Sequence, residues 1–134
     1  MGIAKLGDTM KVTCSVRSSV NGEKLELLGQ LEKLAEFYGA EFSVMGEYPA
    51  WEYKADSKLR DTMVKLYVEM FDKEPEVVAI HAGLECGLLG EKLPGLDCVS
   101  IGPQMHDIHT SREKLEIASV ERTWNFLLEI LKAL

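Results

Sequence analysis

Several features that mark common protein classes are missing from these 134 residues. No apolar run approaches the roughly 20 residues that a membrane-spanning helix needs. The first residues, MGIAKLGDTMK, lack the apolar core and small-residue cleavage site of a secretory signal. Leu6 stands where a myristoylated N-terminus carries Ser or Thr. We therefore expect neither secretion nor membrane anchoring.

Basic residues and cysteines are also few. The chain has 15 Lys and Arg against 22 Asp and Glu, which gives a net charge of -7. This balance argues against a nucleic-acid surface, which needs a basic stripe, and against an anionic membrane. Cys14, Cys86 and Cys98 are odd in number, widely spaced and form no CxxC motif. They are typical of reduced thiols in a cytoplasmic protein, so we expect no disulfide framework.

The residues that are present predict an α/β fold. With 46% hydrophobic and 28% charged residues, the composition is that of an ordinary globular protein. Residues 10–17 alternate like a strand with one wet face, whereas 77–83 and 96–102 are continuously apolar, like parallel strands buried between helices. Helical spacing of apolar residues covers 22–38, 84–92 and 117–134, and Asp56 or Ser57 can cap a further helix that stops before Pro75. A strand begins within 40–51. The order is β-α-β, then α-β-α-β-α, with a junction near 48–54.

Candidate site residues follow the two buried strands. Ligands of parallel α/β sheets bind at the carboxyl ends of the strands, where HAGLECG and GPQMHDIHT stand in this sequence. The residues that could gather there are His81, Gly83, Glu85, His106, Asp107 and His109. Glycine at position 83 would let a ligand approach the backbone closely. Because 102–103 is Gly-Pro, the two later histidines do not share a helix face, and we expect one to point inward and the other outward.

Each of these residues also has a purely structural interpretation. His81 at a strand end fits a satisfied buried histidine, and Glu85 in the first turn of a helix is favoured by the helix dipole alone. Arg17 at the end of a strand fits a solvated charge. Cys86 would act as a nucleophile only with a base such as His81 or His109.

The pattern provides only part of a metal site. A catalytic zinc takes about three protein ligands, and a two-metal site takes more, including a bridging carboxylate. The chain has three histidines and carries no H-x-D, H-E-x-x-H or paired-Glu motif at a strand end. Pattern reasoning alone does not complete the site.

Three stretches resemble one peptidase family. VTCSVRSS, AIHAGLECGLLGEKLPGLDCVSIGP and HDIHTSREKLEIASVERTWNFLLEILK are similar to the C-terminal part of aminoacyl-histidine dipeptidases, also called peptidase D or Xaa-His dipeptidases. These are co-catalytic zinc peptidases related to carnosinases. The resemblance implies that residues 1–50 form the β-α-β half of a ferredoxin-like lid that dimerises. It implies that residues 51–134 form the C-terminal α/β part of the catalytic domain.

The resemblance also implies residue roles. His109, in D-x-H-T, matches the last metal ligand of the family, and Gly83 matches a backbone position along the bound substrate. Arg17, in SVRSS, matches a lid arginine that binds the substrate's terminal carboxylate, a charge-assisted bidentate contact. His81 and Glu85 belong to the matching motif without a definite role, and we place them with the substrate-binding residues.

The remaining machinery of the family has no counterpart in this chain. The early H-x-D segment, the bridging Asp, the Glu pair with the general base and a further acidic ligand would all lie upstream. The complete enzyme would hydrolyse Xaa-His dipeptides with two zinc ions. We therefore expect this chain to be a fragment with no catalytic residue of its own, which neither retains zinc nor hydrolyses dipeptides alone.

A truncated lid and sheet would expose strand edges and apolar faces, so we expect a homodimer or a higher oligomer. Two other functions stay open at this point. One is a non-catalytic, dimerising structural or regulatory module. The other is a small metal-binding protein that uses His81, His106 and His109.

Overall fold

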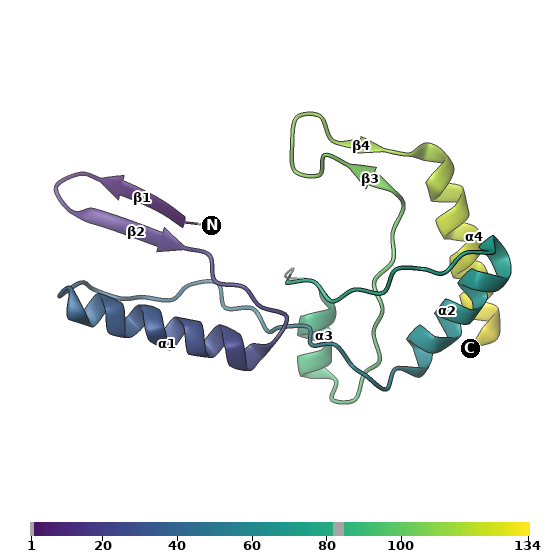
Figure 1. Cartoon of the computed structure of the whole chain (residues 1–134), viewed down its shortest axis with the longest axis horizontal. Coiled ribbons are helices and arrows are strands. Elements are labelled where there is room, and N and C mark those ends of the chain that lie inside the picture. Colours follow the sequence, from purple (N-terminus) through teal and green to yellow (C-terminus); the bar gives the residue numbers. More distant parts are fainter. Residues whose placement is uncertain (1, 82–84) are drawn as a thin grey trace. The chain divides into compact units, whose positions relative to one another are not determined.

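The computed structural model describes residues 2–81 and 85–134 (Figure 1). An N-terminal hairpin is formed by β1 (Gly2–Leu6) and β2 (Met10–Cys14), and a short second hairpin by β3 (Met105–His106) and β4 (Lys114–Leu115). The helices are α1 (Asn21–Phe37), α2 (Lys58–Phe71), α3 (Glu85–Lys92) and α4 (Ile117–Ala133). The α/β class is confirmed, and so are the four predicted helices. None of the described helices has the length and apolarity needed to cross a membrane.

The chain folds as two compact units. The first comprises Met1–Tyr53 and Val78–Pro94, and the second comprises Lys54–Val77 and Gly95–Leu134. The predicted division into a lid part (1–50) and a catalytic part (51–134) refers to the domains of a complete dipeptidase. It stays a prediction.

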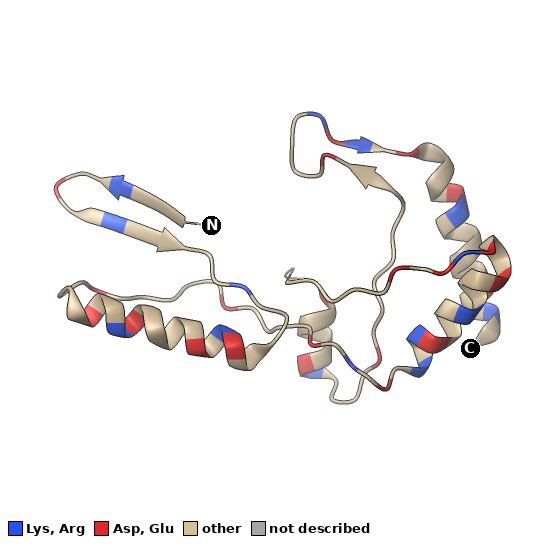
Figure 2. Ribbon diagram, viewed as in Figure 1, with Lys and Arg blue, Asp and Glu red and all other residues tan. Residues whose placement is uncertain are grey.

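The hairpin of the first unit has one apolar face. The register pairs Gly2 with Cys14, Ala4 with Val12 and Leu6 with Met10, and these alternate residues share a face. The opposite face holds the pairs Ile3–Thr13 and Lys5–Lys11, the latter visible as basic residues on both strands (Figure 2). The apolar face is uncovered, since Leu6, Met10 and Val12 are all exposed. Neither strand packs on a helix of the described chain.

The start of α1 holds the segment 48–52 in place. The Asn21 side-chain oxygen accepts a hydrogen bond from the Ala50 amide at 2.9 Å, and the Asn21 amide donates to Glu52 Oε1 at 2.8 Å. Lys24 Nζ donates to the Tyr48 carbonyl. These side chains replace the backbone ladder that a strand in this region would have made.

Helix α3 approaches the same segment closely at Gly87. An added Cβ at this position would lie 2.9 Å from the Pro49 carbonyl oxygen, which is closer than real Cβ atoms come. Gly87 is buried, and only a residue without a side chain allows α3 to pack at this distance.

The core of the second unit lies between α2 and α4. Met63 of α2 and Phe126 and Ile130 of α4 are buried, and the ring of Phe126 meets Tyr67 edge-on with centroids 5.4 Å apart. These are the buried hydrophobic residues of the described chain, and none belongs to the first unit. The packing of one helix pair therefore provides the main apolar burial.

Three predicted strands do not form among the described residues. Residues 40–51, 77–81 and 96–102 form no strand and belong to neither hairpin, and 40–51 bends at Gly46, whose φ is 67°. Val78 is 61% exposed and Ile101 is 43% exposed, so the expectation of strands buried on both faces is wrong for this chain. The physical reason is that a central strand is stabilised by neighbours on both edges, and the described chain provides none.

The accessible surface is large for the mass. It amounts to 10,921 Å² for 15.0 kDa. Even two separate compact bodies of half this mass would together expose only about 8,500 Å². Helices and hairpins therefore form locally, while much of the apolar surface stays uncovered.

Candidate functional site

The predicted metal ligand His109 lies in the loop between β3 and β4 and has an unusual backbone. Asp107 and His109 have φ angles of 50° and 65°, in the left-handed region that residues other than glycine rarely adopt. Such conformations persist where the surroundings enforce them, and they cluster at functional sites. The left-handed backbone thus defines the shape of this loop, as it does for Asp72 at the end of α2.

Hydrogen bonds within the loop maintain this conformation. The Thr110 hydroxyl donates to the Asp107 carbonyl at 2.7 Å and accepts from the Arg112 amide at 3.1 Å. Glu113 Oε2 accepts from the His109 amide at 2.7 Å. The His109 side chain is exposed, and its ring has no hydrogen-bond partner among the described residues. The loop thus fixes the backbone and leaves the imidazole to project outward.

His106 occupies β3, where it pairs with Lys114. Its side chain is exposed, as is that of His109. The prediction that one of the two histidines points inward is therefore wrong for this chain. The reason is that β3 belongs to a two-stranded hairpin that is not part of a larger sheet in the described chain.

The other predicted residues belong to the first unit. Arg17 follows β2 and is exposed, and its Nε donates to Ser15 Oγ at 3.3 Å. His81 is exposed rather than satisfied in a core, and Glu85 is exposed in the first turn of α3. Gly83 lies outside the described residues. Cys86 is a half-buried free thiol.

The structure brings His106 and His109 into one short hairpin, and it places Glu85 at the start of α3, in the same compact unit as His81. These two groups belong to different compact units. Their convergence on one rim stays a prediction.

The described residues do not fit a complete zinc site. No group of three or more His, Cys, Asp or Glu side chains among residues 2–81 and 85–134 is arranged to hold a metal ion. An imidazole can provide one ligand of a zinc site, and His109 is the residue that could do so here. We therefore assign this chain no reaction step at a metal.

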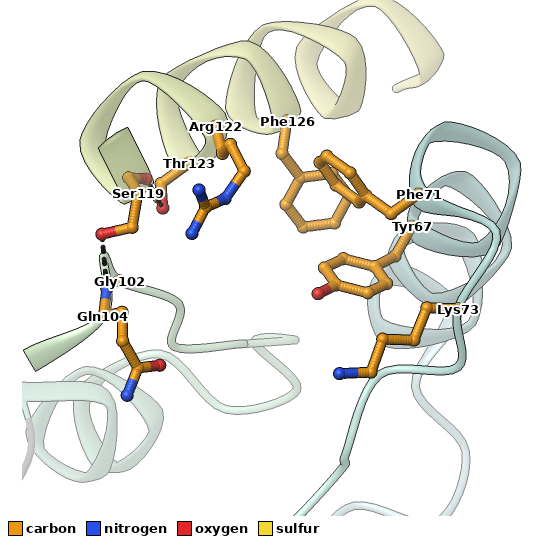
Figure 3. A pocket seen from close by; sticks show the side chains of 9 residues that line it. All are labelled: Tyr67, Phe71, Lys73, Gly102, Gln104, Ser119, Arg122, Thr123 and Phe126. Carbon is orange, nitrogen blue, oxygen red and sulfur yellow. Dashed lines mark hydrogen bonds between the residues drawn. The ribbon is translucent and has the colours of Figure 1, made fainter. Parts of the chain in front are cut away.

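A hollow of about 380 Å³ lies in the second unit, between α2, α4 and the segment 102–104 (Figure 3). The hollow is lined by the aromatic rings of Tyr67, Phe71 and Phe126. Its polar lining residues are Lys73, Gln104, Ser119, Arg122 and Thr123. Ser119 Oγ accepts from the Gln104 amide at 2.8 Å and donates to the Glu116 carbonyl at 2.6 Å. None of the predicted site residues lines the hollow. It is therefore not the candidate site.

Sequence reasoning missed a network at the start of α2. Ser57 caps the helix by accepting from the Arg60 amide at 3.1 Å, and its hydroxyl donates to Asp97 Oδ1 at 2.7 Å. Asp97 Oδ2 accepts from the Leu59 amide at 3.1 Å. The Ser57 and Leu59 hydrogen bonds lower the pKa of the Asp97 carboxyl, aided by Lys54 and Arg60 and opposed by partial burial.

The sequence offers Asp56 or Ser57 as the N-cap of α2, and the structure shows that Ser57 is the cap. No periodic pattern links Ser57 to Asp97, because they lie 40 residues apart. A signal did exist for Gly87, the second glycine of HAGLECG, but only the structure shows that Pro49 requires it.

Comparisons with known proteins show that the chain is similar to dipeptidases. No family model matches the chain. The cytosol non-specific dipeptidase of Escherichia coli K12 is 35% identical over 133 residues, which is 98% of this chain and 27% of that protein. The crystal structure of aminoacylhistidine dipeptidase from Vibrio alginolyticus matches with a TM-score of 0.72 and 34% identity, over 87% of this chain and 24% of that chain. The chain thus spans about a quarter of the length of both. The resemblance to aminoacyl-histidine dipeptidases is confirmed.

Proposed function

We propose that this chain, which resembles a quarter-length segment of two dipeptidases, is the C-terminal portion of a cytoplasmic zinc dipeptidase that cleaves Xaa-His dipeptides. The observation that carries the proposal is the match to a dipeptidase over 98% of the chain. A shared fold with an aminoacylhistidine dipeptidase supports the substrate class. The words "cytosol" and "dipeptidase" in the name of the E. coli relative support the location and the reaction.

His109 provides one zinc ligand in this proposal. Three observations support the role: its place in D-x-H-T, its left-handed backbone at φ 65°, and its exposed ring. The carboxylate of Glu113 fixes the backbone of the ligand rather than its ring. The remaining ligands and the general base come from polypeptide that corresponds to the rest of the relatives.

Arg17 binds the terminal carboxylate of the substrate. Its one hydrogen bond to the described chain is made by Nε, so the two terminal amino groups are available for a bidentate contact. Gly83, Glu85 and His81 lie along the substrate in the HAGLECG motif. Residues 1–50 act as part of the lid, and 51–134 as part of the catalytic domain.

The isolated chain has negligible activity and does not retain zinc, because a single imidazole is too few ligands. Hydrolysis of a Xaa-His dipeptide by the 134-residue chain with added zinc tests this. Turnover similar to that of the full-length E. coli relative would contradict the proposal.

Activity is tested in a chimera in which this chain replaces the matching segment of the E. coli dipeptidase. The chimera should hydrolyse Xaa-His dipeptides, and His109→Ala should lose more than about 100-fold in kcat/KM, since even outer partners of metal ligands matter at 10- to 100-fold. His106→Ala is the matched control, an exposed histidine three residues away, and should retain activity. Equal loss from both substitutions would contradict the assignment.

A second function is favoured by the uncovered hairpin. The apolar face of Leu6, Met10 and Val12 and the unpaired strand edges suit a homodimer or higher oligomer, in which the chain is a non-catalytic dimerising module. Met10→Glu should then weaken self-association at least about 10-fold by light scattering, since a buried charge is costly. Thr13→Glu, on the opposite face, is the control. A parent chain that is monomeric at micromolar concentration would contradict the proposal that the chain is a dimerising module.

A further inference from the structure

The backbone amide of His109 is held by a side chain. Glu113 Oε2 accepts its hydrogen bond at 2.7 Å, and the amide has no backbone partner among the described residues. Asp72, which also has a left-handed φ, differs in this respect, because its amide donates to the Val68 carbonyl at 2.9 Å. A backbone carbonyl is present whatever the sequence, whereas the bond at His109 requires one particular side chain.

The backbone of Glu113 is anchored by the hairpin that carries it. Its amide donates to the Thr110 carbonyl at 3.2 Å. The next residue, Lys114, pairs with His106 between β4 and β3. The carboxylate therefore reaches back to His109 from a position that the hairpin sets, and it closes the loop between the two strands.

The bond between Glu113 and His109 is charge-assisted, since a carboxylate accepts from an amide. Such bonds are shorter and roughly twice as strong as those between neutral groups. None of the ion pairs formed by the described residues includes Glu113, so no cation there competes with the amide for the carboxylate. Both partners are exposed, and water therefore limits the strength of the bond.

The direction of the His109 side chain depends on this backbone conformation. At a φ of 65°, the Cα–Cβ bond leaves the loop in a different direction than it would at an ordinary negative φ. The groups of a metal or catalytic site must be held to within about 0.5 Å by their surroundings. Without the bond to Glu113, other values of φ become accessible to His109, and its imidazole turns away.

We propose that Glu113 is a positioning residue for His109 that acts through the backbone amide. The proposal rests on the proposed function, in which His109 is a zinc ligand, and adds a second residue to that site. Glu113 holds the left-handed conformation of His109 and thereby sets the direction of the imidazole. Its hydrogen-bond acceptor, placed at the correct reach, matters for this role, and its negative charge as such does not.

Three substitutions at one position separate the acceptor from the charge. Glu113→Gln keeps an acceptor oxygen at the same reach and removes the charge. Glu113→Asp keeps the charge on a side chain that is one methylene shorter, and Glu113→Ala removes both. In NMR measurements on the 134-residue chain, hydrogen exchange of the His109 amide should accelerate about 10-fold in the Asp and Ala variants. It should stay close to the parent rate in Glu113→Gln.

The zinc affinity of the dipeptidase chimera, measured by competition with a chelator, gives the second readout. Glu113→Ala and Glu113→Asp should weaken zinc binding by about 10-fold, as the loss of an outer partner of a metal ligand does. Glu113→Gln should bind zinc like the parent chimera. Glu121→Ala removes an exposed carboxylate from α4 and is the control for net charge, so it should leave the affinity unchanged.

Parental zinc affinity in Glu113→Ala would overturn the proposal. So would an affinity that follows the charge, with Glu113→Asp like the parent and Glu113→Gln like Glu113→Ala. A parental exchange rate of the His109 amide in Glu113→Ala would also overturn it, and this measurement does not depend on the chimera.

The His109→Ala chimera distinguishes failure of this inference from failure of the proposed function. Parental zinc affinity in His109→Ala contradicts the metal ligand and with it the proposed function. A chimera that loses zinc in His109→Ala but not in Glu113→Ala contradicts the positioning role alone.

Discussion

Trp124 and Phe126 lie two positions apart on α4, yet Trp124 is 58% exposed and Phe126 is 7% exposed. The step of two residues turns the helix by about 200°, so one ring packs against α2 and the other lies outside that contact. A helix that carries a large aromatic residue on each of two sides is typically packed between two layers of structure. In this chain only one layer is present among the described residues.

The two rings should therefore differ in their effect on the stability of the isolated chain. Phe126→Ala should lower the free energy of unfolding by about 3 kcal/mol, because it opens a cavity in the small α2–α4 core. Trp124→Ala should change it by less than about 0.5 kcal/mol, as exposed substitutions do. Urea denaturation followed by circular dichroism measures both. A larger loss for Trp124→Ala would show that the face of α4 that holds Trp124 is already covered.

Gly87 and Gly90 provide a second matched pair, on α3. Gly90→Ala should stabilise the chain by up to about 1 kcal/mol, because alanine favours a helix and a Cβ there meets nothing within 4 Å. Gly87→Ala should destabilise it by about 1 kcal/mol or more, because the new Cβ clashes with the Pro49 carbonyl. Thermal unfolding of the two variants checks the opposite signs. A stabilising Gly87→Ala would mean that α3 does not pack on the segment 49–51.

The carboxyl of Asp97 should make stability depend on pH. Its folded-state pKa is lowered from the ordinary value of 3.8, chiefly by the hydrogen bonds from Ser57 and Leu59. A lowered pKa means that the carboxylate stabilises the folded chain fully above its unfolded pKa, and that this contribution disappears as the pH falls from about 4 through the folded pKa.

Asp97→Asn should accordingly cost about 0.5 to 1 kcal/mol at pH 7, a value for a partly exposed charge at a helix N-terminus. The difference in unfolding free energy between parent and variant should shrink as the pH is lowered from 5 to about 2.5. Other carboxylates titrate in both proteins, so the difference isolates Asp97. A difference that does not change with pH would contradict the role of this charge.

The helices followed from local chemistry and could be predicted. Ser57 caps α2, as expected of a hydroxyl residue that directly precedes a run of apolar residues at helical spacing. Gly39, which follows α1, has the left-handed φ of 63° that a glycine after a helix commonly adopts. Apolar spacing located α4 within a residue of its observed end. Such signals lie within a few residues of the element that they specify.

The strands were harder to predict, because strand formation depends on partners that are distant or belong to other polypeptide. The run 96–102 has the composition of a central strand and forms no strand in the described chain. In contrast, Gly2–Leu6 has no strong strand pattern, was not predicted, and forms β1 because Met10–Cys14 lies beside it. The apolar residues of a segment thus indicate which of its faces would be buried in a sheet. Whether the segment forms a strand depends on a second segment that pairs with its backbone.

The candidate site divides in the same way. Pattern reasoning selected His106 and His109 equally, and only the family resemblance distinguished them. The structure adds the left-handed backbone at His109 and its bond to Glu113, neither of which has a sequence signature. Long-range pairs such as Ser57–Asp97 lie beyond any local pattern.

The zinc content of the dipeptidase chimera tests the central claim most directly. Metal analysis of the purified chimera, with this chain in place of the matching segment, should find two zinc ions per chain. The His109→Ala chimera should bind less zinc, while His106→Ala should bind as much as the parent. Full zinc occupancy in the His109→Ala chimera would contradict the claim that this imidazole is a metal ligand.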